Sequence, residues 1–432
     1  MKVWVKVGLL SFGGPAGQIA VMHKILVEEK AWVSEDRFLH ALNYCMLLPG
    51  PEAQQLAVYI GWLLHGWAGG MAAGCLFVLP GFLSILALSV VYAVFLKIQM
   101  VTAFFFGLKA ATLAVVIEAV FRIGKKALKN RTMVGLAGVA FLAIFLAEVP
   151  FPIIILLAGC LGMLGGRYAP ERFCVIRGHD VKDSDETFGP EPGWGRALKV
   201  LALGLSLWFG PILALRLWLG PDHAIVIQAV FFSKAAVVTF GGAYSVLAYV
   251  AQQAVKVYGW LLPGEMLDGL GMAETTPGPL IQVVQFVAFM GAYRHPGSLP
   301  PLTAAVLASV VTAWVTFVPC FLWIFLGAPY IERLRGNRIV SAGLSTITAA
   351  VVGVVLNLAV WFAVHVAFHR VEEMRAHGLR WLRPDVASVD WPAVLIGSGA
   401  FFALFKLRWN MIATLLLAAL VGNLWQAFRA LL

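Results

Sequence analysis

Two short motifs, each present twice, are the part of this sequence best suited to chemistry. Phe-Gly-Gly occurs at residues 12–14 and 240–242, and Pro-Gly-Pro occurs at residues 49–51 and 277–279. Proline lacks a backbone N–H and clashes with the preceding helical turn, so two prolines around a glycine end one helix and begin another. Glycine also allows a second backbone to approach closely. Each motif therefore predicts a break in an otherwise apolar helix.

A broken helix has a preferred ligand charge. The segment after each Pro-Gly-Pro begins with unpaired N–H groups at the positive end of the helix dipole, which suits an anion. Glutamines near the breaks, including Gln285, add neutral donors for oxyanion oxygens. The alternative is that the motifs are only packing kinks, a reading that their paired occurrence disfavours. The predicted substrate-binding residues at the breaks are Gly13, Gly14, Gln18, Pro49, Gly50, Pro51, Gln54, Gln55, Gly241, Gly242, Pro277, Gly278, Pro279 and Gln282.

Ionisable residues inside apolar segments are the second group of candidates, because charges in a membrane are costly and usually face a polar interior. Lys109 is predicted to supply positive charge to the anion. Lys6 and Lys234 could also do so, or could extend to the membrane interface, and Lys109 and Glu118 could form a structural pair. The candidates for charge or for ion coupling are Lys6, Lys234, Glu52, Glu118 and Glu274.

The composition indicates an all-α polytopic membrane protein. Of the 432 residues, 61% are hydrophobic and 12% are charged, about half the charged fraction usual in soluble domains. Apolar stretches of about 20 residues match the hydrocarbon core of a bilayer. The net charge of +10 comes from short basic loops, which indicates membrane orientation rather than nucleic-acid binding.

The chain contains an internal repeat. Residues 3–60 align without a gap with residues 231–288, and the register shifts near residues 293–302. The identical positions include Lys6/Lys234, Trp32/Trp260, Gln54/Gln282 and both motifs. We predict a first repeat domain at 1–168, a polar cytoplasmic linker at 169–197 and a second repeat domain at 198–432.

The charges of the loops predict the topology. The basic loop 122–131 is placed in the cytoplasm, as is the loop with Arg333, Arg335 and Arg338, whereas its counterpart near Lys97 is external. Predicted spans include 3–22, 39–64 and 67–96. The sum is about 13 transmembrane helices in two inverted repeats with broken helices. If the Pro-Gly-Pro segments re-enter instead of crossing, this count changes.

No feature of the sequence predicts an enzyme. It contains no nucleotide-binding or nucleophile motif, so we predict no cofactor. The five cysteines form no cluster, so we also predict no metal site. A membrane-embedded enzyme acting on a lipid or an oxyanion would need a redox centre or a nucleophile. No cleavable signal peptide is evident, and the apolar N-terminal segment is predicted to remain as a helix.

The motifs and their surroundings resemble the chromate ion transporter family. The resemblance covers nearly the whole chain and rests on SFGGPAGQIAVMHKILVEEKAW from residue 11, LLPGPEAQQLA from residue 47, FVLPG from residue 77, FGGAYSVLAYV from residue 240 and MAETTPGPLIQVVQFVAFMGA from residue 272. It implies a long-chain, two-domain member. A short hydrophilic segment that the resemblance implies before Ser11 is absent from this sequence.

The resemblance implies secondary active export of chromate across the bacterial inner membrane and chromate resistance. Energy would come from a proton or anion gradient, with sulfate as a competing or exchanged anion. The residues alone indicate an anion transporter, and sulfate or another tetrahedral oxyanion remains the alternative substrate.

Overall fold

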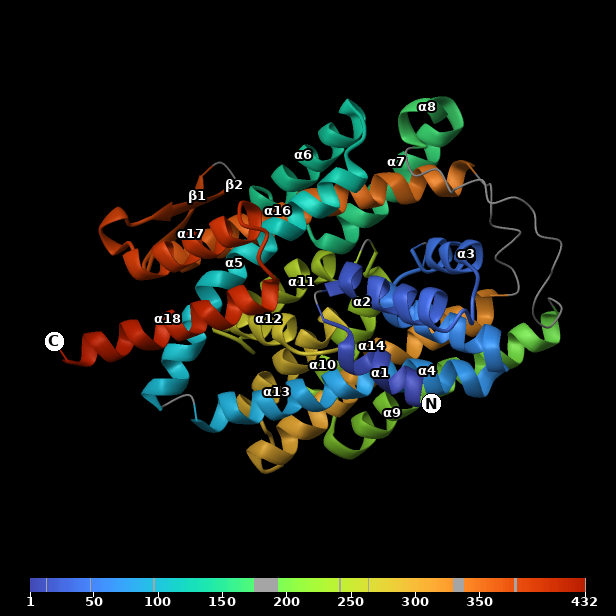
Figure 1. Cartoon of the computed structure of the whole chain (residues 1–432), viewed down its shortest axis with the longest axis horizontal. Coiled ribbons are helices and arrows are strands. Elements are labelled where there is room, and N and C mark those ends of the chain that lie inside the picture. The colour runs from blue at the N-terminus through green and yellow to red at the C-terminus, as the bar shows by residue number, and fades with distance from the viewer. Residues whose placement is uncertain are drawn as a thin grey trace. The chain divides into compact units, whose positions relative to one another are not determined.

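A computed structural model describes most of the chain, and helices make up nearly all of it (Figure 1). Several predicted features lie outside the described residues: Gly13, Gly241, Lys97, Arg333, Arg335 and most of the linker. The described residues are 1–12, 14–46, 48–95, 98–174, 193–240, 242–262, 264–328, 338–376 and 379–431.

The chain divides into two compact units, each assembled from three separate stretches of sequence. Unit 1 consists of Met1–Ala87, Arg177–Val246 and Thr276–Asn337. Unit 2 consists of Leu88–Ile176, Leu247–Thr275 and Arg338–Leu432. These units are groups of mutual contacts and are not the sequence repeats, whose boundaries remain a prediction.

Unit 1 holds both Phe-Gly-Gly and both Pro-Gly-Pro motifs. The long helix α4 belongs to it up to residue 87. Its elements are α1 (Lys2–Leu10), α2 (Gly14–His23), the π-helix η1 (Lys24–Glu29), α3 (Glu35–Cys45), α4 (Glu52–Phe95), α9 (Trp194–Leu219), α10 (Ala224–Val238), η3 (Leu280–Gln282), α13 (Val283–Arg294) and α14 (Pro301–Gly327).

Unit 2 contains the end of α4 and a set of helices joined to one β-hairpin. The helix α11 (Ala243–Gln252) starts in unit 1 and continues into unit 2. The other elements of unit 2 are α5 (Gln99–Ala127), α6 (Arg131–Phe145), α7 (Phe151–Tyr168), α8 (Pro170–Phe173), the π-helix η2 (Gln253–Val257), α12 (Glu265–Thr275), α16 (Arg338–Ala367), β1 (Val371–Ala376), β2 (Leu379–Pro384), η5 (Val386–Ser388), α17 (Trp391–Phe405) and α18 (Met411–Leu431).

The lengths and compositions of the helices are those of a multi-pass membrane protein. Among the described residues, seven helices are long and apolar enough to cross a bilayer, and four shorter apolar helices accompany them. The predicted span 3–22 is interrupted and forms α1 and α2. Within α4, the backbone leaves the helical region at His65 and Gly66, where the predicted spans 39–64 and 67–96 meet.

Small residues bring the helices of unit 2 into close contact. A Cβ added at Gly107 of α5 would lie 2.1 Å from the carbonyl oxygen of Ala418 in α18. At Gly353 of α16 it would lie 2.1 Å from the carbonyl oxygen of Ala137 in α6. Helices in lipid gain little from hydrophobic burial against one another, so close packing through small residues stabilises their association.

The antiparallel hairpin β1–β2 is the one departure from an all-α fold in the described chain. It pairs Val371 with Pro384 and Ala376 with Leu379, and it follows the long helix α16. The sequence pattern predicts no strand in this stretch.

Candidate functional site

Each Phe-Gly-Gly motif follows a helix that ends in the same way in both repeats. In α1, the hydroxyl of Ser11 donates to the carbonyl oxygen of Val7 at 2.6 Å. After α10, the hydroxyl of Thr239 donates to the carbonyl oxygen of Ala235, also at 2.6 Å. Each hydroxyl thereby bonds to the carbonyl oxygen four residues earlier. The backbone carbonyls of Ser11 and Thr239 themselves accept from beyond the helix.

Four glycines of the motifs require a backbone that other residues rarely adopt. The φ angles are 68° at Gly14, 97° at Gly242, 123° at Gly50 and 95° at Gly278. These positions are equivalent between the repeats, and positive φ favours glycine because it has no Cβ. Both kinds of motif interrupt helices, as the sequence predicts.

The breaks of the two repeats bond to each other reciprocally. The Gly50 N–H of the first repeat donates to the carbonyl oxygen of Thr239 in the second at 2.7 Å. The Gly278 N–H of the second repeat donates to the carbonyl oxygen of Ser11 in the first at 2.8 Å. Each Pro-Gly-Pro is therefore joined to the Phe-Gly-Gly of the other repeat. We call these four residues, with Gly81 and Cys320 described next, the break cluster.

Helices that contain a proline pack against both Pro-Gly-Pro breaks. Pro80 lies inside α4 and Pro319 inside α14, and each is followed by a small residue of the break cluster. A Cβ added at Gly81 would lie 2.4 Å from the Pro277 carbonyl oxygen. A Cβ added at Gly50 would lie 2.8 Å from the Cys320 sulfur. The helices α4 and α14 thus approach the breaks too closely for a larger side chain at Gly81 or Gly50.

Four of the five predicted amide donors have backbone partners in this structure. Two of the acceptors, Gly278 and Pro49, belong to the breaks, where carbonyls lack helical donors, and the other two lie in α4 on either side of Pro80. The Nε2 groups donate from Gln18 to the Gly278 oxygen at 2.7 Å, from Gln55 to Pro49 at 2.7 Å, from Gln282 to Val78 at 2.8 Å and from Gln285 to Phe82 at 3.1 Å.

Gln54 is the exception. Its side chain is fully buried in the first turns of α4, and neither amide atom has a hydrogen-bond partner among the described residues. Leaving a buried polar group unpaired costs about 1–3 kcal/mol. An amide kept in this state beside a helix break is well suited to bind a ligand with oxygen atoms.

The half-helices that follow the breaks are enclosed by protein. Residues 53–61 of α4 are buried, and so is every residue of α13 from Val283 to Ala292. Irregular backbone at membrane depth is tolerated where protein buries it or where it lines a cavity. The positive ends of the two half-helices therefore lie in the interior of unit 1, where their dipoles are poorly screened by solvent.

The ionisable candidates are distributed over both units. Lys6 pairs with Glu29 at 3.2 Å, and Lys234 is exposed. Glu52 is half-buried at the start of α4. In unit 2, Glu118 pairs with Arg122 at 3.5 Å on one face of α5, and Glu274 is buried in α12. Lys109 also belongs to unit 2, where it contacts Asp268, a residue that the sequence analysis did not select.

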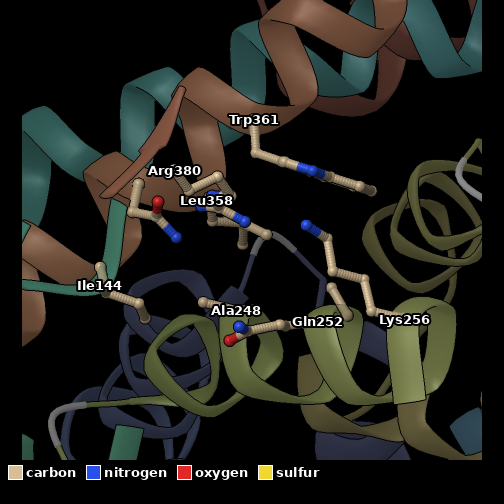
Figure 2. A pocket seen from close by; sticks show the side chains of 9 residues that line it. Ile144, Ala248, Gln252, Lys256, Leu358, Trp361 and Arg380 are labelled. Atoms are coloured by element: carbon tan, nitrogen blue, oxygen red, sulfur yellow. The ribbon is translucent and has the colours of Figure 1, made fainter. Parts of the chain in front are cut away.

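A pocket in unit 2 lies outside both motifs. Figure 2 shows Lys256, at the end of the α11–η2 segment, extending toward Trp361 of α16. The Trp361 ring is buried, and its Nε1–H has no partner among the described residues. The lining residues are Ile144, Ala248, Ala251, Gln252, Lys256, Asn357, Leu358, Trp361 and Arg380.

Glu148 forms ion pairs with three basic residues beside this pocket. Its carboxylate lies 2.7 Å from a nitrogen of Arg375, 3.2 Å from Arg380 and 3.8 Å from Lys256. Lys256 also bonds to Glu373 of β1. These ion pairs connect the hairpin and the η2 segment to the turn between α6 and α7.

The network changes the ionisation of Glu373. Partial burial raises the pKa of Glu373, but the hydrogen bond from Lys256 and the charges of Lys256 and Arg380 outweigh it, so the pKa lies below its usual value. Because the folded-state pKa is lowered, this stabilisation is present above the usual pKa and is lost as pH falls through the folded-state value.

We expect Glu148→Gln to destabilise the protein, because it leaves three cations without their shared carboxylate. Glu148 is only partly buried, so the loss is roughly 1–3 kcal/mol, less than for a fully buried pair. Thermal unfolding in detergent measures it. Glu372→Gln, an exposed position on the same strand, is the matched control, and equal transition temperatures for the two variants would contradict the network's importance.

The comparisons with known proteins agree with this architecture. A family model described as "Chromate transporter" matches residues 1–163 and 227–423, which is most of the chain and includes all four motifs. The chain belongs to the chromate transporter family. The residues of this chromate transporter family member that the match leaves out between its two segments are 164–226, which include the polar stretch.

Curated relatives match over most of their length. The chain is 30% identical to the chromate transport protein of Pseudomonas aeruginosa, over 98% of this chain and 91% of the relative. It is 27% identical to the chromate transport protein of Cupriavidus metallidurans, over 83% of this chain and 81% of the relative. An uncharacterized transporter of Methanocaldococcus jannaschii is 24% identical, over 98% of this chain and 92% of the relative. No solved structure matches the chain significantly.

Proposed function

We propose that this protein is a secondary active transporter that exports chromate across the bacterial inner membrane and thereby confers chromate resistance. The observation that carries the proposal is the break cluster, in which the broken helices of both repeats meet inside unit 1. Discontinuous helices in paired repeats are the usual location of a substrate site in secondary transporters. The family and the relatives named as chromate transport proteins supply the identity of the anion.

The dianion would bind at the start of the two half-helices. Gln54 would donate to one of its oxygens, because this amide is buried without a partner. The Gly50 and Gly278 N–H groups, which now bond to Thr239 and Ser11, would exchange those carbonyls for oxyanion oxygens. Such N–H groups at a helix start suit an anion by geometry and by dipole. Substrate binding would then loosen the contact between the repeats, which alternating access requires.

The proposal includes the topology predicted from the sequence. It has about 13 transmembrane helices in inverted repeats, with the domains 1–168 and 198–432 on either side of a cytoplasmic linker at 169–197. The equivalent glycines at the four breaks support a common origin for the repeats. The loop charges support their opposite orientation.

A transport assay tests the proposal. Everted membrane vesicles that contain the protein should accumulate radiolabelled chromate, with imposed proton and sulfate gradients tested separately. We expect Pro51→Ala/Pro279→Ala to reduce the initial rate at least about tenfold, because a continuous helix removes the N–H groups of the break. Pro211→Ala, at a proline inside α9 and outside the break cluster, is the control. Full transport by the double variant at normal membrane abundance would exclude the breaks as the site.

The same vesicles distinguish the alternative substrate. Chromate and sulfate share tetrahedral shape and charge, and a neutral amide such as Gln54 bonds equally to the oxygens of either. Sulfate that competes with chromate without being transported supports chromate as the substrate. Sulfate that is accumulated faster than chromate would make the protein a sulfate transporter.

A further inference from the structure

A second polar cluster lies in unit 2 and consists of Tyr92, Lys109 and Asp268. The Tyr92 hydroxyl, near the end of α4, donates to Oδ2 of Asp268 at 2.8 Å. The Lys109 ammonium of α5 lies 3.5 Å from the same oxygen. The other carboxylate oxygen, Oδ1, is buried and has no partner among the described residues. Ionisable groups buried within a membrane protein mark functional sites by default.

Asp268 and Lys109 differ in how much of the side chain is exposed. The Asp268 side chain is 4% exposed, whereas that of Lys109 is 31% exposed. An ammonium facing lipid is costly, so we take the exposed part of Lys109 to face water, where an anion could reach it. Asp268 is shielded by protein.

Close packing fixes this geometry. A Cβ added at Gly264 would lie 2.6 Å from the Lys109 Nζ, and one added at Gly271 would lie 2.7 Å from Leu108. Gly264, just before α12, and Gly271, within it, let this segment approach α5 on both sides of Asp268. The backbones thus hold Lys109 within reach of Asp268, while the flexible lysine side chain can still turn toward a ligand.

Few other charges face this carboxylate. Glu265, at the start of α12, is buried, and its Oε2 accepts a hydrogen bond from the Leu262 N–H at 2.7 Å. The helix α18 also packs on α12, and in its described part the one ionisable residue is Arg429, near its C-terminus. Lys109, Tyr92 and Glu265 are thus the titratable groups that control the charge of Asp268.

We propose that Asp268 is the proton-binding residue of this transporter and that Lys109 alternates between Asp268 and a tetrahedral dianion. While Asp268 is ionised, it neutralises Lys109 and acts as an internal anion. When a proton binds to the carboxylate, Lys109 keeps an unbalanced positive charge and takes up the dianion. Proton binding and anion binding then favour each other to an equal extent, as linkage requires. The proton and the dianion would cross together with one net negative charge, so the membrane potential, and not an inward proton gradient, would drive their export.

This inference deepens the proposed function, since it assumes that the dianion bound by Lys109 is the transported anion, held there at a step separate from its binding at the break cluster. Its test is a binding measurement that requires no transport. Radiolabelled sulfate is the probe because it stays a dianion over the pH range used, and equilibrium dialysis with purified full-length protein measures its affinity. Sulfate binding with the expected pH dependence, together with no chromate transport in vesicles, would retain the inference and reject chromate export.

We expect the wild-type affinity to fall by up to about tenfold per pH unit above the titration of Asp268, the limit for one linked proton. Asp268→Asn should bind sulfate tightly with no pH dependence, and Asp268→Glu should restore the dependence. Lys109→Met should weaken sulfate binding at low pH to the level that the wild type shows at high pH. Asp36→Asn, an exposed aspartate of α3, is the matched control and should behave as the wild type.

Tyr92→Phe keeps the test decisive if Asp268→Asn does not fold. It removes one donor to the carboxylate, so the pH at which the affinity falls should move upward while the slope is kept. A purely structural role for Tyr92 would change stability without this shift. The inference is overturned by an unchanged pH dependence in Asp268→Asn, by full affinity in Lys109→Met, or by absence of saturable sulfate binding to the wild type.

Discussion

Gly81→Ala is expected to abolish most transport, with initial chromate uptake reduced at least about tenfold, equivalent to 1.4 kcal/mol or more in the transport barrier. The added methyl group would lie 1.9 Å from Gln282 Oε1 and 2.4 Å from the Pro277 carbonyl oxygen. Gln282 can rotate away, but the Pro277 oxygen belongs to the backbone of the break. The helix α4 must therefore move away from the second Pro-Gly-Pro, and overpacking of this kind costs typically 1–3 kcal/mol.

Gly195→Ala is the matched control for this prediction. Gly195 lies in α9 of the same unit, and a Cβ there would meet no heavy atom within 4 Å. Alanine also favours helix over glycine, so this variant should transport normally. The two variants are compared in uptake, in membrane abundance and in thermal unfolding. Equal uptake by both would show that the contact between Gly81 and the break has no functional importance.

Gln54→Leu is expected to reduce transport without lowering thermal stability. The wild-type amide has no hydrogen-bond partner among the described residues, so an apolar side chain of similar size should leave thermal stability unchanged or raise it. Transport should fall by about 10- to 100-fold, because a hydrogen bond to a charged group is worth about 1.5–3 kcal/mol. The measurements are the unfolding temperature in detergent and the chromate concentration that gives half-maximal uptake.

Gln55→Leu, one residue further along α4, gives the contrasting result. Gln55 donates to the Pro49 carbonyl oxygen at 2.7 Å, so its loss should lower the unfolding temperature by leaving that carbonyl without a donor. If Gln54→Leu instead destabilises the protein as much as Gln55→Leu does, the Gln54 amide has a structural partner. The assignment to substrate would then be rejected.

The broken helices could be predicted from the sequence because their cause is local. Proline and glycine act on their own backbone, and the same residues recur in both repeats. The partners of the breaks could not be predicted in this way. The bond from Gly50 to Thr239 and the bond from Gln18 to Gly278 depend on distances between segments far apart in the chain, which no local pattern contains.

Asp268 shows a second limit of sequence reasoning. The repeat draws attention to positions that are the same in both halves, but the counterpart of Asp268 in the first half is His40. A comparison of the repeats therefore misses a residue that functions in only one of them. For Lys109, the sequence left function and structural pairing open, with Glu118 as the suggested partner. In the structure Lys109 pairs with Asp268, whereas Glu118 pairs with Arg122.

The reciprocal bonds between the breaks have a consequence for chains of half this length. A chain with a single repeat would contain one Pro-Gly-Pro N–H and one carbonyl at its Phe-Gly-Gly helix end, both in apolar surroundings and both without the partner that the other half supplies. Unpaired backbone groups are costly in lipid. Such a chain should therefore fold stably only when another copy, or a sister chain, exchanges these bonds with it, so that assembly in pairs is a requirement of the motif itself.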